Sequence, residues 1–149
     1  MKRALKVSAY MLVFLFVISQ FYQPVLNKNE GQVDSVDFMQ SYAVPQKVNS
    51  ILRSSCYDCH SNNTHYVWYD HIQPIRFLVE GHIKDAKEAL NFSEWGTYSE
   101  RKQERLLTSI IKQIDTGQMP LPSYTLMHRD AKLNTEKTKI LIHWLKDQE

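Results

Sequence analysis

Both cysteines of this 149-residue chain lie in one short stretch, SSCYDCHSN, at residues 54–62. Cys56 and Cys59 are three positions apart, and His60 follows the second cysteine directly. Two cysteines placed at random in a chain of this length have that spacing about 1% of the time, so the pattern indicates chemistry. Three chemistries use a Cys-x-x-Cys pair: a redox dithiol, part of a zinc site, and covalent attachment of a c-type haem.

The remainder of the sequence argues against the first two chemistries. A thioredoxin-like dithiol lies in a βαβ context, and this sequence has no convincing strand pattern. A structural zinc site needs four ligands, usually with a second closely spaced Cys/His pair. The other histidines form no such pair: His65, His71, His82, His128 and His143.

Cys-x-x-Cys-His is the attachment signature of c-type haem. Two thiols one helical turn apart can each form a thioether at one edge of the porphyrin, and the next side chain then points at the iron. We therefore predict one covalently attached haem c, with thioethers at Cys56 and Cys59 and with His60 as the proximal iron ligand. His60 has to bind as a neutral imidazole, so its other ring nitrogen should donate to a backbone carbonyl near Gln73 or Pro74.

The second axial ligand is less tightly specified by the sequence. Met119 is the first choice, because Pro120 holds it extended in a stiff loop after a helix end. A thioether ligand raises the reduction potential of the iron. Met127 is the alternative thioether, whereas His128 and His82 are alternatives that would give bis-histidine ligation and a lower potential.

Amphipathic patterns predict the helices that position these groups. A short helix should run from Val44 into the cysteine motif, and three longer helices should cover about residues 74–90, 99–117 and 134–146. The helix at 74–90 should bury one stripe of its surface, formed by Ile75, Leu78, Val79, His82, Ile83 and Ala86. The domain at residues 44–149 is therefore predicted to be all-α.

Residues 1–22 are interpreted as an N-terminal membrane anchor or signal segment, and the polar residues 23–43 as a tether. Ala4 to Tyr22 would reach about 28 Å as a helix, close to a hydrocarbon core of roughly 30 Å. No clean Ala-x-Ala cleavage site follows, which favours an uncleaved, single-pass anchor in a bacterial inner membrane with the haem domain on the periplasmic side. The alternative is a soluble periplasmic protein after signal cleavage. The net charge of +2 predicts no nucleic-acid partner.

Four stretches resemble the bacterial haem-binding domain family of small, membrane-anchored, cytochrome c-like proteins: CYDCHSNNTHYVWY, LNFSEWGTY, GQMPLPSY, and HRDAKLNTEK followed by ILIHW. They fall in the family's order over residues 44–145, although Val67 and Arg129 stand where prolines are expected. The resemblance implies a class I cytochrome c-like helical fold around one haem. It also implies thioethers at Cys56 and Cys59, proximal ligation by His60 and distal ligation by Met119.

The predicted function is one-electron transfer between exported redox proteins, with the membrane as the partner of the N-terminal helix. Two other functions remain open. In a haem-based sensor, a small ligand would bind at an open iron. A small peroxidase-like enzyme would also need a distal acid–base group, for which His82 and His128 are the candidates. An electron carrier is favoured over a catalyst, because a six-coordinate iron leaves no substrate pocket.

Overall fold

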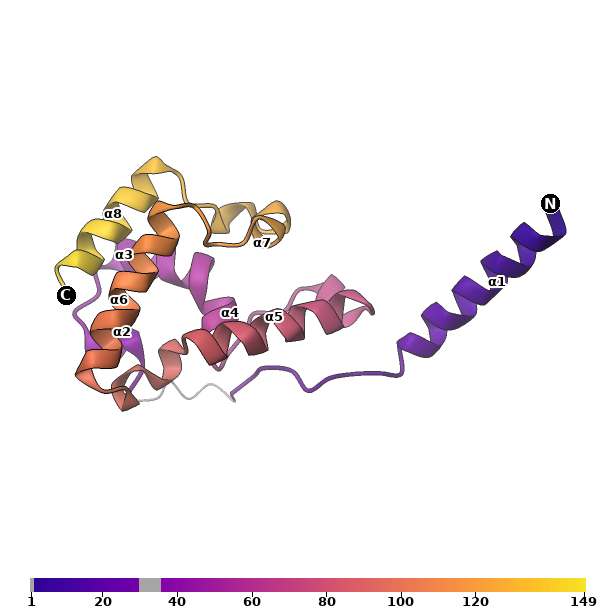
Figure 1. The fold of residues 1–149 in the computed structure, drawn as a ribbon, viewed down its shortest axis with the longest axis horizontal. Helices are drawn as coiled ribbons and strands as arrows, with labels where there is room; N and C mark the ends of the chain where they lie inside the picture. Colours follow the sequence, from indigo (N-terminus) through magenta and orange to yellow (C-terminus); the bar gives the residue numbers. More distant parts are fainter. Residues whose placement is uncertain (1, 30–35) are drawn as a thin grey trace.

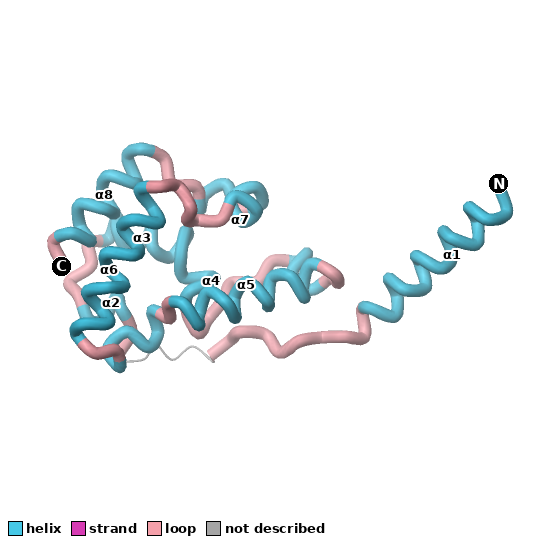
Figure 2. Tube along the Cα trace, in the orientation of Figure 1, coloured by secondary structure: helices cyan, strands magenta, loops and turns pink. Residues whose placement is uncertain are grey.

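The computed structural model describes residues 2–29 and 36–149. Its secondary structure within these ranges is helical, and the described residues include no strand, only an isolated bridge between Lys28 and Asn63. Figure 2 shows these helices and the loops that connect them. The prediction of an all-α chain is therefore confirmed.

The helical elements follow one another along the whole described chain. They are α1 (Lys2–Ser19), α2 (Phe38–Ser41), α3 (Gln46–Leu52), a π-helical turn η1 (Arg53–Tyr57), α4 (Asp58–His60), η2 (Trp68–His71), α5 (Ile75–Ala89), η3 (Phe92–Thr97), α6 (Glu100–Asp115), α7 (Pro122–Met127), η4 (Arg129–Ala131) and α8 (Thr135–Lys146).

The three longer helices begin and end close to the predicted bounds. Pro74 is the N-cap of α5 and Ser99 is the N-cap of α6. Asn134 caps α8 through its side chain, which accepts a hydrogen bond from the Lys137 backbone N–H at 2.8 Å. Gly117 has φ of 67°, the left-handed conformation that ends α6.

The hydrophobic core lies between α2, α3, η3, α6 and α8. Phe38 is at its centre and is fully buried, and its ring lies 4.8–5.8 Å, centroid to centroid, from four other aromatic rings: Tyr42, Phe92, Trp95 and Trp144. Asp37 caps α2 by accepting from the Met39 backbone N–H at 2.8 Å. Residues 37–42 fell inside the predicted tether, so the packed domain begins before residue 44.

Residues 20–29 also contact the domain, although they too fell largely in the predicted tether. The Asn27 side chain donates to the Ser61 carbonyl at 2.8 Å and to the Thr64 hydroxyl at 2.9 Å. The buried Arg76 guanidinium donates to Gln23 and to the backbone carbonyl of Pro24. This segment therefore lies against α5 and the loop that follows His60 (Figure 1).

Helix α1 extends away from the other helices (Figure 1). It has 18 residues, and Lys2, Arg3 and Lys6 place three charges within its first two turns. Its uncharged part falls short of the roughly 20 apolar residues that a membrane span needs. None of the helices described for this chain combines the length and the apolar character needed to cross a bilayer, so the transmembrane anchor expected within residues 1–22 is not found.

The apolar stripe of α5 is not buried by other helices as predicted. Ile83 is 3% exposed, but Ile75 is 40% exposed and Leu78 is 56% exposed. α5 contacts α4 and η2, and the Leu90 carbonyl at its C-cap lies 3.0 Å from His60 Nδ1. The apolar surface near its start faces a cleft, which is described below.

The position of Phe38 gives a test of this core. Phe38→Ala should lower the free energy of unfolding of the cofactor-free chain by about 3–5 kcal/mol, since it removes a fully buried ring. Phe77→Ala is the matched control, because Phe77 is 57% exposed and its loss should cost about 0.5 kcal/mol or less. Urea denaturation measures both. Equal costs would contradict the placement of α2 in the core.

Candidate functional site

The cysteine motif lies on one continuous stretch of helix. The chain passes from α3 through the π-helical turn η1 into α4, with helical backbone angles at Tyr57 and Asp58. Cys56 ends up in the π-helical turn and Cys59 in α4, so the two thiols lie one turn apart on neighbouring positions of one face. The helix ends at Ser61, whose φ of −135° is extended. π-Helical turns are rare and frequently mark functional sites.

Burial keeps both thiols protonated. It raises the pKa of Cys56 to about 12 and that of Cys59 to about 11, and neighbouring Asp58 and Asp70 add to the rise at Cys59. Dithiol exchange and zinc binding both use the thiolate, which is scarce at neutral pH when the pKa is so high. The environment of this pair therefore suits neutral sulfur, as in a free thiol or a thioether.

His60 is held by a carbonyl at the far end of α5. Its Nδ1 lies 3.0 Å from the backbone oxygen of Leu90, and because a carbonyl can only accept, Nδ1 is the donor. The lone pair is then on Nε2, the tautomer that a metal needs. Burial lowers the pKa of His60, although hydrogen bonds to the carbonyls of Leu90 and Ala86 oppose the shift.

This acceptor corrects the expectation of a carbonyl near Gln73 or Pro74. Those residues precede α5, whereas α4 packs beside the C-terminal half of that helix. The last carbonyls of a helix have no partner within the helix, so Leu90 is free to accept from the imidazole. Gln73 is instead buried against the N-terminal segment, where its side chain donates to the Tyr22 carbonyl at 2.6 Å.

A cleft with mainly apolar walls lies between α5 and α7, and α4 contributes Asp58 and Cys59 to its lining. Its empty space is about 840 Å³ when the open mouth is counted. Ile75, Leu78 and Val79 line it from α5, while Leu121 and Met127 line it from the α7 side. This cleft is the reason why the predicted stripe of α5 stays exposed. Two facing apolar walls beside a cysteine are suited to a flat, hydrophobic ring system.

Polar side chains of the cleft form one connected network. The Tyr124 hydroxyl donates to Asp58 Oδ2 at 2.6 Å, which ties α7 to the helix of the cysteine motif. The Tyr124 ring stacks on His128 with centroids 4.2 Å apart. His128 Nδ1 lies 3.2 Å from the Tyr124 carbonyl, so its Nε2 accepts from the Tyr69 hydroxyl, also at 3.2 Å.

Sequence reasoning did not single out Asp58 or Tyr124 as site residues. Asp58 is the residue before Cys59, and its importance depends on a partner 66 positions away. A helical pattern in PSYTLMH would have placed Tyr124 and His128 on one face, four positions apart. Pro120 and Pro122 directed the interpretation towards an extended loop, yet Pro122 is accepted in the first turn of α7.

The structure brings some of the predicted iron ligands to the cleft and leaves others outside it. Cys56 and His60 are not among its described lining residues, whereas His82, Met127 and His128 line it, as does Cys59, one of the two predicted attachment residues. Met119 is absent from the described residues that line the cleft; it is half-buried in the loop after α6, where its backbone N–H donates to the Gln113 carbonyl at 3.2 Å. The role of Met119 at the iron therefore stays a prediction, with Leu121 marking where its loop reaches the cleft.

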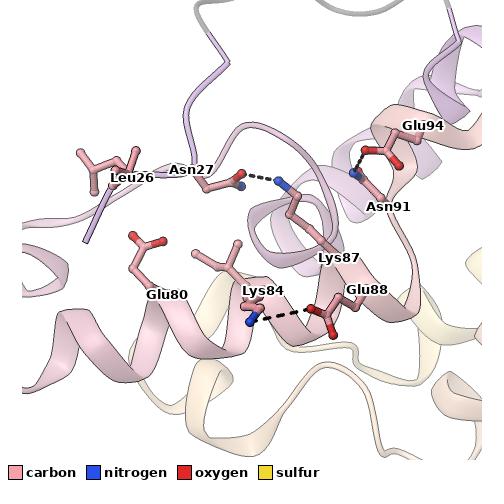
Figure 3. Close-up of a pocket in the computed structure, with 10 residues that line it drawn as sticks. Leu26, Asn27, Glu80, Lys84, Lys87, Glu88, Asn91 and Glu94 are labelled. Carbon is pink, nitrogen blue, oxygen red and sulfur yellow. Dashed lines mark hydrogen bonds and ion pairs between the residues drawn. The ribbon is translucent and has the colours of Figure 1, made fainter.

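A second hollow on the other side of α5 has a different character. Figure 3 shows its polar lining, in which Lys87 Nζ donates to Asn27 Oδ1 at 2.7 Å and Lys84 lies 4.0 Å from Glu88. Lysine and glutamate side chains lie together in this lining. It suits water rather than an apolar ring, so the α5–α7 cleft is the candidate site.

The lowered pKa of His60 predicts a pH dependence of stability. As pH falls below the ordinary value of 6.5, the unfolded chain binds a proton before the folded chain does, so folding loses stability. Between about pH 7.5 and about pH 5.5, the unfolding free energy of cofactor-free His60→Asn should therefore decrease less than that of the wild type. His143→Asn, which removes an exposed histidine from α8, is the control. Identical pH profiles for His60→Asn and the wild type would contradict the prediction.

Comparison with known proteins bears directly on this site. Residues 14–147 match the model of a family described as a haem-binding domain. Neither the curated proteins nor the solved structures contain a match to this chain. The matched region includes the cysteine motif, both walls of the cleft and the aromatic core. This chain therefore belongs to the haem-binding domain family.

Proposed function

We propose that this protein is a monohaem c-type cytochrome that carries single electrons. The observation that carries the proposal is the hydrogen bond from His60 Nδ1 to the Leu90 carbonyl, which leaves Nε2 as a lone-pair donor one residue from Cys59. Cys56 and Cys59 would hold the haem through thioethers, and His60 would bind the iron. Bound haem supplies a one-electron iron couple.

The surroundings of these residues fit that chemistry. Thioether sulfur carries no charge, so attachment leaves no thiolate in the buried setting of Cys56 and Cys59. The apolar walls on α5 and α7 would exclude water from both faces of the ring. A dry setting also raises the reduction potential, because it disfavours the more highly charged oxidised iron.

We further propose that the protein works in an exported compartment and exchanges electrons with other exported redox proteins. Haem of this type is attached outside the bacterial cytoplasm. An N-terminal segment in which Lys2, Arg3 and Lys6 come before an apolar run is typical of export signals. The two features support each other, because covalent haem attachment requires export and the N-terminal segment would direct that export.

A second candidate function is the binding of a small ligand at an open iron. One observation favours it: in the cleft, His128 Nε2 already accepts a hydrogen bond from Tyr69, and Met119 is not among the described lining residues. An iron with only His60 bound would leave a coordination position free. Tyr69 and His128 could then stabilise a bound ligand by hydrogen bonding.

Covalent attachment can be tested by haem staining of denaturing gels. The double variant Cys56→Ser with Cys59→Ser should lose the stain completely, because serine forms no thioether with the ring. Deletion of residues 2–22 should also abolish staining, because the chain would stay in the cytoplasm. Ser54→Ala, a change in the same helix, should keep wild-type staining. Staining that survives the double substitution would refute covalent attachment.

The distal ligand separates the two candidate functions. In the electron carrier, oxidised wild type should show a methionine–iron charge-transfer band that disappears in Met119→Ala and persists in Met127→Ala. Loss of the band only in Met127→Ala would transfer the role to that residue. A high-spin, five-coordinate wild type that binds carbon monoxide rapidly would contradict electron carriage and support ligand binding.

A further inference from the structure

Asn91 is almost entirely buried, at 2% exposure, yet its polar groups make several hydrogen bonds. Its Oδ1 accepts from the Ser93 backbone N–H at 3.1 Å, which caps η3. Its Nδ2 donates to Glu94 Oε1 at 2.8 Å and to Asn62 Oδ1 at 2.9 Å. Figure 3 shows the Asn91 side chain turned towards Glu94, just beyond the end of α5.

The bond to Asn62 crosses between two segments that also meet at the candidate iron ligand. Asn62 lies two residues after His60, and Asn91 follows Leu90, whose carbonyl accepts from His60 Nδ1 at 3.0 Å. A further bond joins the same segments, from the Asn62 backbone N–H to Ser93 Oγ at 3.1 Å. Two links beside the imidazole thus fix where the Leu90 carbonyl lies relative to the ring.

We infer that Asn91 is a positioning residue for His60: by binding Asn62, its amide holds the Leu90 carbonyl in line with Nδ1. The assignment of His60 to iron rests on the proposed function, whereas the hydrogen-bond geometry does not. A well-aligned Nδ1–H bond increases electron density at Nε2 and makes imidazole a stronger ligand for oxidised iron. Asn91 therefore lowers the reduction potential of the haem.

A purely structural role for Asn91 would act through the cap of η3 and through the bond to Glu94. Asn91→Ser keeps the cap, because serine is also a good N-cap, but it removes both Nδ2 bonds, to Asn62 and to Glu94. Asn62→Ser separates the two roles, because it removes the Asn91–Asn62 side-chain bond and leaves the cap and the Glu94 bond intact. Asn63→Ser is the matched control, since Asn63 is exposed and lies on the same loop.

The first measurement is the reduction potential of the haem-loaded, full-length protein. Asn91→Ser and Asn62→Ser should each shift the potential upwards, and the double variant should shift no further than the single variants, because both break one link. Asn63→Ser should match the wild type. Potentials that are equal in all four variants and the wild type would overturn the inference.

The second measurement uses the cofactor-free chain and nitrogen NMR of His60. In the wild type, the His60 proton should be on Nδ1. In Asn91→Ser that proton should exchange with water roughly tenfold faster, as expected for the loss of one buried hydrogen bond. Unchanged exchange would overturn the role of Asn91 even if the wild type stains for haem. Failed staining of the wild type, with faster exchange in the variant, would instead refute the proposed function and leave the positioning role standing.

Discussion

The hydrogen bond between His60 and the Leu90 carbonyl joins two parts of the chain that are 30 residues apart in sequence. It uses a carbonyl that α5 leaves without a helical partner, and a nitrogen that must be protonated for Nε2 to bind a metal. The meeting of α4 with the end of α5 depends on this pair and on the amide network of Asn91 beside it. Once α5 is anchored there, its other half projects outwards and forms one wall of the cleft.

Apolar side chains gather in two separate regions of the protein, the core around Phe38 and the cleft between α5 and α7. Around Phe38, aromatic rings from α2, η3 and α8 pack against one another in the core. Along α5 and α7, apolar side chains remain exposed towards the cleft. Exposed apolar surface of this kind costs about 25 cal/mol per Å². A bound ring that covers both walls would bury these side chains and so stabilise the complex. A haem-binding family is expected to have such an arrangement.

The two residues between the cysteines connect these two regions. The Tyr57 hydroxyl donates to Asp37 at 2.9 Å, towards the core, and the Asp58 carboxylate accepts from Tyr124, across the base of the cleft. The helical stretch that carries the cysteine motif is therefore held from both sides. Rigid support of this kind keeps the two sulfur atoms and the imidazole in fixed relative positions, which the proposed haem attachment would require.

Local patterns were enough to predict the helical class, the ends of α5, α6 and α8, and the pairing of two cysteines with a histidine. Caps, prolines and 3.6-residue periodicity act within a few residues, so a sequence shows them directly. Three features came only from long-range packing: Phe38 as a core residue, Leu90 as the partner of His60, and Tyr124 as the partner of Asp58. Each depends on contacts between segments at least 30 residues apart, which no local pattern contains.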